Sequence, residues 1–251
     1  MRPIWAQIVG VGLLLGAILS PGSGSAQTAL PNWNGVWERV GGITFDPTLP
    51  RGVVDSPPYN AEYAARYRAI LEGERIGKPF SDPSAQCLPP GMPRVMNMVY
   101  PLEVIVAPGK VTLIAEWMSQ VRHIYTDGRP LPTDPEPTFN GYSIGRWQGG
   151  ELLVETVGMR GDTVFNAAGA PHSESMVVRE RFWQVDADTL KAEITVNDPK
   201  AFTKPWTVVK TYSRRPNWDL LEYVCEENNR NPVDENGVTG VILTSKTGGQ
   251  K

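Results

Sequence analysis

The segment from Phe139 to Val157, FNGYSIGRWQGGELLVETV, constrains the fold most strongly. Asn140-Gly141 favours a tight turn, because these residue types accept positive φ angles at low cost. Gln148-Gly149-Gly150 predicts a second turn. Between and after these turns, apolar and polar residues alternate as they do in strands, and Leu152, Val154 and Thr156 share one face. The segment therefore predicts an antiparallel hairpin.

Similar alternation continues on both sides of this hairpin. The further strands that we expect span residues 102–106, 111–118, 120–126, 176–185, 190–196, 206–213 and 220–225. Strands in sequence-adjacent order are typical of a closed antiparallel β-barrel, since closure removes exposed edges. A two-sheet sandwich is the alternative fold.

The first strand is expected near Gly35-Val36-Trp37. This Gly-x-Trp resembles the motif that opens the first strand of lipocalin-like barrels, in which the Trp closes one end of the barrel. The resemblance implies a lipocalin-like β-barrel, whereas the simpler alternative is an ordinary first strand with a core Trp.

One amphipathic helix is expected over residues 56–77, in the N-terminal half of the chain. Asn60 can act as its N-cap, and Tyr63, Tyr67, Ile70 and Leu71 form one apolar stripe. We expect this helix to cover a barrel end or a sheet face.

The N-terminus has the features of a secretory signal peptide. Arg2 precedes an apolar run from Ile8 to Leu19, and Gly24-Ser25-Ala26 fits a signal-peptidase site. The run is short for a membrane span, which needs about 20 apolar residues, although an uncleaved anchor is the alternative. We expect a signal peptide over residues 1–26, one barrel domain over 27–228 and a polar tail over 229–251, in a periplasmic or secreted protein.

Charge and cysteine content narrow the function classes. A net charge of −3 argues against a general binder of nucleic acid or of anionic membranes. In an oxidising compartment, the two cysteines, Cys87 and Cys225, predict a disulfide rather than a metal site. A nucleophilic cysteine is the alternative.

The strand alternation also places ionisable residues beside apolar ones. Glu116, Glu155 and Glu180 are candidate acid–base residues, and Arg122 shares a face with Ile124. An unpaired buried charge is costly, so these residues should either pair with one another or face a wet cavity. A structural Arg–Glu network is the alternative to a site.

His172 lies on a loop just before a predicted strand. Beside Glu174 or Asp162 it could act as a general base near neutral pH; the alternative is a surface histidine without a role. Because the chain has two separated histidines and no phosphate-loop or dinucleotide motif, we expect neither a metal site nor a cofactor.

Four signatures together resemble a family of exported bacterial β-rich proteins of unknown function. They are CLPPGMPR from Cys87, YTDGR from Tyr125, NGYSIGRW from Asn140 with LVET from Leu153, and PHS from Pro171. The resemblance implies no mechanism, but it picks out Arg94, Asp127, Arg129, Arg146, His172, Cys87 and Cys225.

We therefore expect a barrel whose cavity binds a small, largely apolar molecule. The expected ligand-binding residues are Arg122, Asp127, Arg129, Arg146, Trp147 and Met96. The alternatives are a cofactor-independent lyase, isomerase or hydrolase that uses His172 or a barrel glutamate, and an envelope protein with a filled core. A small molecule is the expected partner, without nucleic acid or stable membrane insertion.

Overall fold

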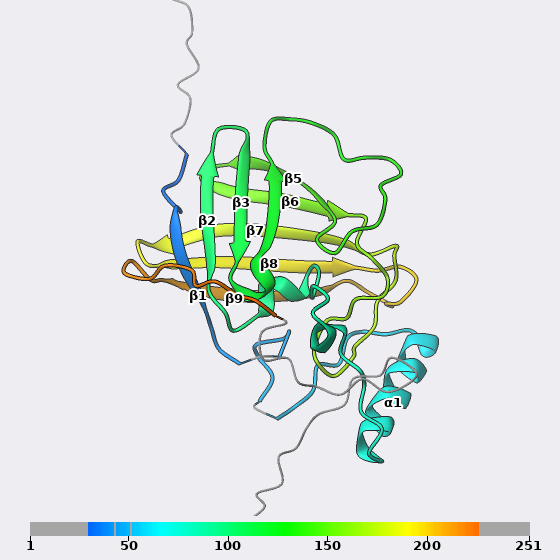
Figure 1. Cartoon of the computed structure of the whole chain (residues 1–251). Helices are drawn as coiled ribbons and strands as arrows, with labels where there is room; N and C mark the ends of the chain where they lie inside the picture. Colours follow the sequence, from blue (N-terminus) through cyan, green and yellow to red (C-terminus); the bar gives the residue numbers. More distant parts are fainter. Residues whose placement is uncertain (1–29, 43, 51, 226–251) are drawn as a thin grey trace, which may run out of the picture.

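The computed structural model describes residues 30–42, 44–50 and 52–225 of the chain. The predicted signal peptide and the predicted polar tail lie outside the described residues. Within them the chain forms a β-barrel with a helix, α1, beside one end (Figure 1).

In this part of the chain, nine strands close into the barrel in sequence order, and β9 pairs with β1. The lipocalin-like barrel is thus confirmed. The strands are β1 Gly35–Val40, β2 Leu102–Ala107, β3 Lys110–Ala115, β4 Gln120–Tyr125, β5 Tyr142–Gln148, β6 Glu151–Val157, β7 Val177–Asp186, β8 Thr189–Asn197 and β9 Trp206–Arg214.

The predicted hairpin is β5 and β6. Its register runs from Tyr142 opposite Val157 to Gln148 opposite Glu151, and both turn glycines have positive φ angles. Gly145 faces the barrel interior, where a Cβ atom would lie 2.8 Å from the Ile124 side chain. A larger residue at this position would therefore push β4 and β5 apart.

Two expectations about the strands are wrong. β4 and β5 pair in parallel, because the Pro-rich connection between them returns the chain to the end at which β4 began. Residues 220–225 form no strand. Since β9 already pairs with β1, the closed barrel offers no free edge to a further strand.

The two barrel ends differ in their connections. We call one the turn end, because the short β2–β3, β5–β6 and β7–β8 turns lie there. At the other end, which we call the loop end, lie the long connections: the described residues of 41–60 (41–42, 44–50 and 52–60), and residues 76–101, 158–176 and 198–205. The loop end therefore carries most of the irregular structure.

Trp37 closes the turn end. Its ring is fully buried, and the Arg214 guanidinium lies 4.2 Å from the ring centroid. Arg214 also donates hydrogen bonds to the carbonyl oxygens of Asn32, Asn34 and Ala187. These bonds tie residues 32–34 to the β7–β8 turn.

The predicted helix is α1, Ala61–Arg75. The predicted N-cap at Asn60 and the predicted Cys87–Cys225 disulfide are also confirmed. Asn60 Oδ1 accepts a hydrogen bond from the backbone N–H of Tyr63, and Tyr63 and Tyr67 are buried.

Cys87 and Cys225 form a disulfide, with their Cα atoms 5.6 Å apart. Three short 3₁₀ helices complete the elements of the described chain: η1 Pro83–Gln86, η2 Arg94–Asn97 and η3 Trp117–Ser119.

None of the helices in the described ranges combines the length and the apolar character that a bilayer span requires.

Candidate functional site

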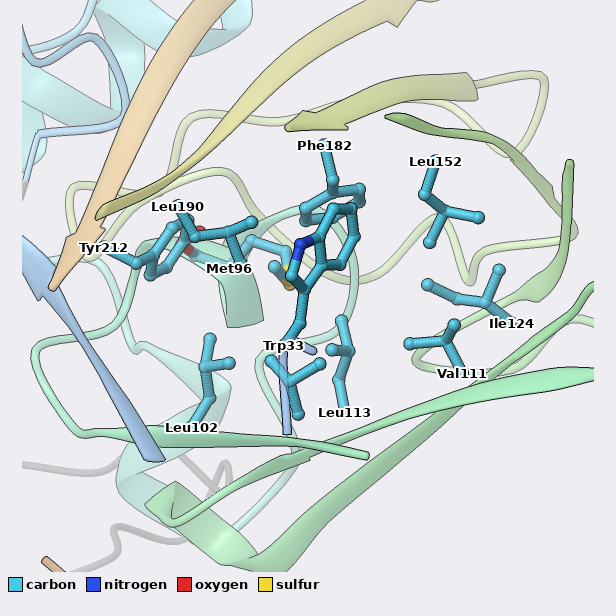
Figure 2. A pocket seen from close by; sticks show the side chains of 11 residues that line it. Trp33, Met96, Leu102, Val111, Leu113, Ile124, Leu152, Phe182, Leu190 and Tyr212 are labelled. Carbon is cyan, nitrogen blue, oxygen red and sulfur yellow. The ribbon is translucent and has the colours of Figure 1, made fainter. Parts of the chain in front are cut away.

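The barrel interior is filled by its own side chains. Figure 2 shows the indole of Trp33 in the middle of the apolar residues that line it, among them Met96, Phe182 and Tyr212. The space left between them has a volume of about 10 Å³, close to the minimum for one water molecule. The barrel interior therefore has no room for an organic ligand in this conformation.

Trp147 packs against Trp33, with ring centroids 5.0 Å apart. Both indole N–H groups are buried, and neither has a hydrogen-bond partner among the described residues. Of the expected ligand-binding residues, Met96 thus belongs to the packed core of the barrel, and the partly buried Trp147 packs against that core.

Arg122 and Glu180 form a buried ion pair inside the barrel, as the alternation of β4 and β7 predicted. Arg122 Nη1 donates to Glu180 Oε1 at 3.0 Å, and Nη2 donates to the other carboxylate oxygen. The Ser143 and Thr156 hydroxyl oxygens accept the remaining bonds, at 3.0–3.2 Å. The pair is fully satisfied within the core.

The alternation places the other two candidate glutamates, Glu116 and Glu155, on apolar strand faces, but neither lies on an inner face of the barrel. β3 ends at Ala115, and Glu116 accepts a hydrogen bond from the backbone N–H of Leu221. Glu155 lies on the outer face of β6 and pairs with Arg179 at 2.8 Å. Alternation identifies two faces of a strand but does not determine which face points inward.

His172 is buried at the loop end rather than exposed on a loop surface. Its Nδ1 lies 3.0 Å from the Ser173 carbonyl oxygen, and its Nε2 lies 2.7 Å from the Thr163 hydroxyl. Because a carbonyl oxygen only accepts, we assign a proton to Nδ1. The Thr163 hydroxyl beside Nε2 also donates to the Arg160 carbonyl oxygen, at 3.1 Å. Burial lowers the pKa of His172 and favours the neutral ring. Neither Glu174 nor Asp162 is its hydrogen-bond partner.

The remaining predicted ligand-binding residues lie outside the barrel. Arg129 pairs with Asp127 on an exposed loop and packs on the Tyr125 ring at 3.7 Å. Arg146 lies on the outer face of β5, beside an open depression over β5 to β8. The structure therefore does not bring the predicted residues together in one site.

A cleft of about 420 Å³ lies at the loop end, and we call it the loop-end cleft. Its volume is within the range of small-molecule sites. Val53, Val54, Val99 and Phe165 provide apolar surface. The full lining comes from residues 44, 52–55, 74, 94, 97–99 and 165–168.

Asp55 is the buried acid of this cleft. Its carboxylate accepts hydrogen bonds from the backbone N–H groups of Phe45 and Asp46, at 2.9 and 2.7 Å, and from Asn166 at 3.0 Å. These bonds hold Phe45, Asp46 and Asp55 against the loop that carries Phe165. Asp55 thus shapes the cleft wall.

Two buried cations lie behind the same wall. Lys210 Nζ donates to Asn97 Oδ1 at 2.6 Å, to the Thr44 carbonyl oxygen at 3.3 Å and to the carbonyl oxygen of Phe45. Arg39 Nε donates to the Met98 carbonyl oxygen at 3.3 Å. Burial, with the charge of Arg39, lowers the pKa of Lys210 to about 7.

Sequence reasoning missed Lys210 and Arg39, although a signal was present. Lys210 alternates with Val208 and Tyr212 on the inner face of β9, and Arg39 follows Trp37 on the inner face of β1. In each case an ionisable residue shares a strand face with apolar residues, which is the pattern that singled out Arg122.

A larger groove, of about 760 Å³, runs beside the β4–β5 junction and contains Arg129 and His123. Its ionic groups already have partners within the chain, since Arg129 pairs with Asp127 and His123 lies 3.2 Å from the Thr112 hydroxyl. The loop-end cleft is smaller, but the buried carboxylate of Asp55 lies in its wall, and we take it as the better candidate.

No group of three or more His, Cys, Asp or Glu side chains is placed to hold a metal ion in the part of the chain that the structure describes.

Compared with protein-family models and with curated proteins, the sequence matches neither a family nor a relative. The resemblance to exported β-rich proteins therefore stays a prediction.

Proposed function

We propose that this protein binds a small, largely apolar molecule, and that the loop-end cleft is its binding site. The observation that carries the proposal is the cleft itself, which has a volume of about 420 Å³ and a lining that combines apolar side chains with buried polar groups. Such a combination is typical of small-molecule sites. The filled barrel then serves as the rigid support for the loops that form the cleft.

Binding has more support than catalysis. Both ring nitrogens of His172 are engaged by Thr163 and Ser173, and Glu180 is bonded to Arg122. Neither His172 nor Glu180 lines the cleft. The predicted residues of the acid–base alternative thus do not lie at the surface where a substrate would bind; the acids that line the cleft are Asp55, which is hydrogen-bonded within its wall, and Glu74.

Export is part of the same proposal. The Cys87–Cys225 disulfide supports it, because such bonds persist in oxidising compartments outside the cytoplasm. A periplasmic or secreted binder would take up its molecule directly from the surrounding medium.

Retention of metabolites tests the proposal. The purified, disulfide-bonded protein is incubated with an extract of its source, and the retained compounds are identified by mass spectrometry. Val54→Arg and Val99→Arg place a charge in the cleft at positions that are 43% and 51% exposed, where it should be compatible with folding. Val209→Arg, on the outer face of β9 at 39% exposure, is the matched control.

The wild-type protein and the control should retain the same compound, and both cleft variants should lose it. Equal retention by Val99→Arg and the wild type would contradict the proposed site. Conversion of the compound to a new product would instead favour the enzyme alternative.

A further inference from the structure

The groove beside the β4–β5 junction, which we call the β4–β5 groove, is a second large hollow that the proposed function does not use. Its volume is about 760 Å³, within the range of small-molecule sites. It is lined by residues 89, 120–123, 125, 129–132 and 138–144, none of which lines the loop-end cleft. The two hollows are therefore separate.

The parallel pairing of β4 with β5 places His123 beside Tyr142. Ile124 is opposite Ser143, and both are buried in the barrel. The preceding residues, His123 and Tyr142, therefore point outward, because successive side chains of a strand alternate between its two faces. Neighbouring strands lie about 4.7–4.9 Å apart, so these two side chains are neighbours on the outer surface. Both line the β4–β5 groove.

Tyr142 presents part of an aromatic ring to this groove. Its side chain is 36% exposed. The ring rests against Gly158, where a Cβ atom would lie 3.2 Å from the ring atom Cδ2. The backbone at Gly158 thus supports the ring from one side, while the exposed part is available for an apolar contact.

Neutral polar groups lie beside this ring. His123 is exposed, and its Nδ1 lies 3.2 Å from the Thr112 hydroxyl, which leaves Nε2 for another partner. Asn140 donates through Nδ2 to the Val121 carbonyl oxygen at 3.2 Å. The Asn140 Oδ1 atom is buried and has no hydrogen-bond partner among the described residues. An unused acceptor in the wall of the groove favours a ligand that donates hydrogen bonds.

The groove offers little to a charged ligand. Its lining contains two arginines and neither Asp nor Glu. Arg129 pairs with Asp127 at 2.6 Å and lies over the Tyr125 ring, and Arg122 is bonded to Glu180 inside the barrel. Because both guanidinium groups already have a carboxylate partner, the lining favours a neutral ligand.

We propose that the β4–β5 groove binds a neutral saccharide, with the C–H face of one sugar ring against Tyr142 and a hydroxyl group bonded to His123. A saccharide combines an apolar C–H face with uncharged hydroxyl groups that both donate and accept. These are the properties that the aromatic ring, the free imidazole nitrogen and the unused amide oxygen favour together. The inference goes beyond the proposed function, since it concerns a second site.

The experiment titrates the disulfide-bonded protein with three neutral trisaccharides, cellotriose, maltotriose and chitotriose, and follows side-chain NMR signals. We expect at least one of them to cause saturable shifts at Tyr142 and His123, and none at Val53 or Val99 of the loop-end cleft. Trigalacturonate, which carries carboxylates, should bind no more tightly. Tyr142→Ala should weaken the binding of the neutral sugar by about tenfold, and His123→Ala by a smaller factor.

Tyr100→Ala is the matched control, because Tyr100 is 37% exposed and stacks on Trp117 outside the groove. It should keep the wild-type affinity. A lack of saturable shifts with all three neutral sugars would overturn the proposal, as would shifts at the cleft valines alone. Tighter binding of trigalacturonate would overturn the neutral ligand class. These outcomes are measured on the wild-type protein and leave the test of the loop-end cleft unaffected.

Discussion

Arg122 and Glu180 form an ion pair sealed inside the barrel, with side chains that are 3% and 0% exposed. The pair joins β4 to β7 across the interior, and Ser143 and Thr156 on β5 and β6 bond to the same guanidinium. Four strands thus share one polar cluster within an apolar core.

Removing one member of this pair should be costly, because the other is left as an unpaired buried charge. We predict that Arg122→Met and Glu180→Leu each lower the free energy of unfolding by about 3–5 kcal/mol. The double variant should lose less than the sum of the two. Chemical denaturation of all four proteins provides this double-mutant cycle, and additive losses would show that the two side chains are not coupled.

Trp33 fills the centre of the barrel at 1% exposure. Trp33→Ala should therefore destabilise the protein by about 3–5 kcal/mol and open a dry apolar cavity. A rise in Tm with added benzene would reveal this cavity. Trp218→Ala, at 47% exposure, is the matched control and should gain no response to benzene; the same lack of response in Trp33→Ala would mean that the barrel had collapsed around the missing ring.

His172 should make folding stability depend on pH. Burial lowers its pKa in the folded state, so below the ordinary value of about 6.5 the unfolded chain binds more protons than the folded one. The contribution of His172 to stability is therefore complete above pH ~6.5 and decreases as the pH falls towards the folded-state pKa. His172→Asn should flatten this slope in denaturation curves measured between about pH 5 and 7.

His123→Asn, on the outer face of β4, serves as the control for this slope and should leave it intact. If His172→Asn kept the wild-type slope, the buried imidazole would not be its origin.

The Cys87–Cys225 disulfide closes a loop of chain that spans most of the barrel, with a sequence separation of 138 residues. The double variant Cys87→Ser/Cys225→Ser should lose roughly 2–5 kcal/mol of unfolding free energy. Thermal denaturation with and without a reductant measures the loss. Reductant should destabilise the wild type alone, and an equal effect on the double variant would show that it acts elsewhere.

Much of the barrel could be predicted because its determinants are local. The Gly pairs of the hairpin and the alternation in β8 depend on neighbouring residues, and in β8 Leu190, Ala192, Ile194 and Val196 alternate along the strand and all face inward. The cap at Asn60 and the motif at Trp37 are similarly local.

The site was harder to predict, since it depends on contacts between distant segments. Most of the residues that line the cleft, 44, 52–55, 97–99 and 165–168, lie outside the strands and α1, in segments that lack their periodicity. Glu155 illustrates a second difficulty. Leu153 and Val157, which share its strand face, are only half buried on the outside of β6. Apolar residues on the same strand face therefore did not show that Glu155 points into the core.

The most direct measurement is a methyl NMR titration of the disulfide-bonded protein with octanoate. Methyl groups of Val53, Val54 and Val99 report on the loop-end cleft, whereas those of Val111, Leu113 and Leu152 report on the barrel interior. We expect saturable shifts at the cleft valines and little change in the interior. Shifts confined to the interior residues would contradict the account, because they would mean that Trp33 moves aside and the barrel itself is the binding site.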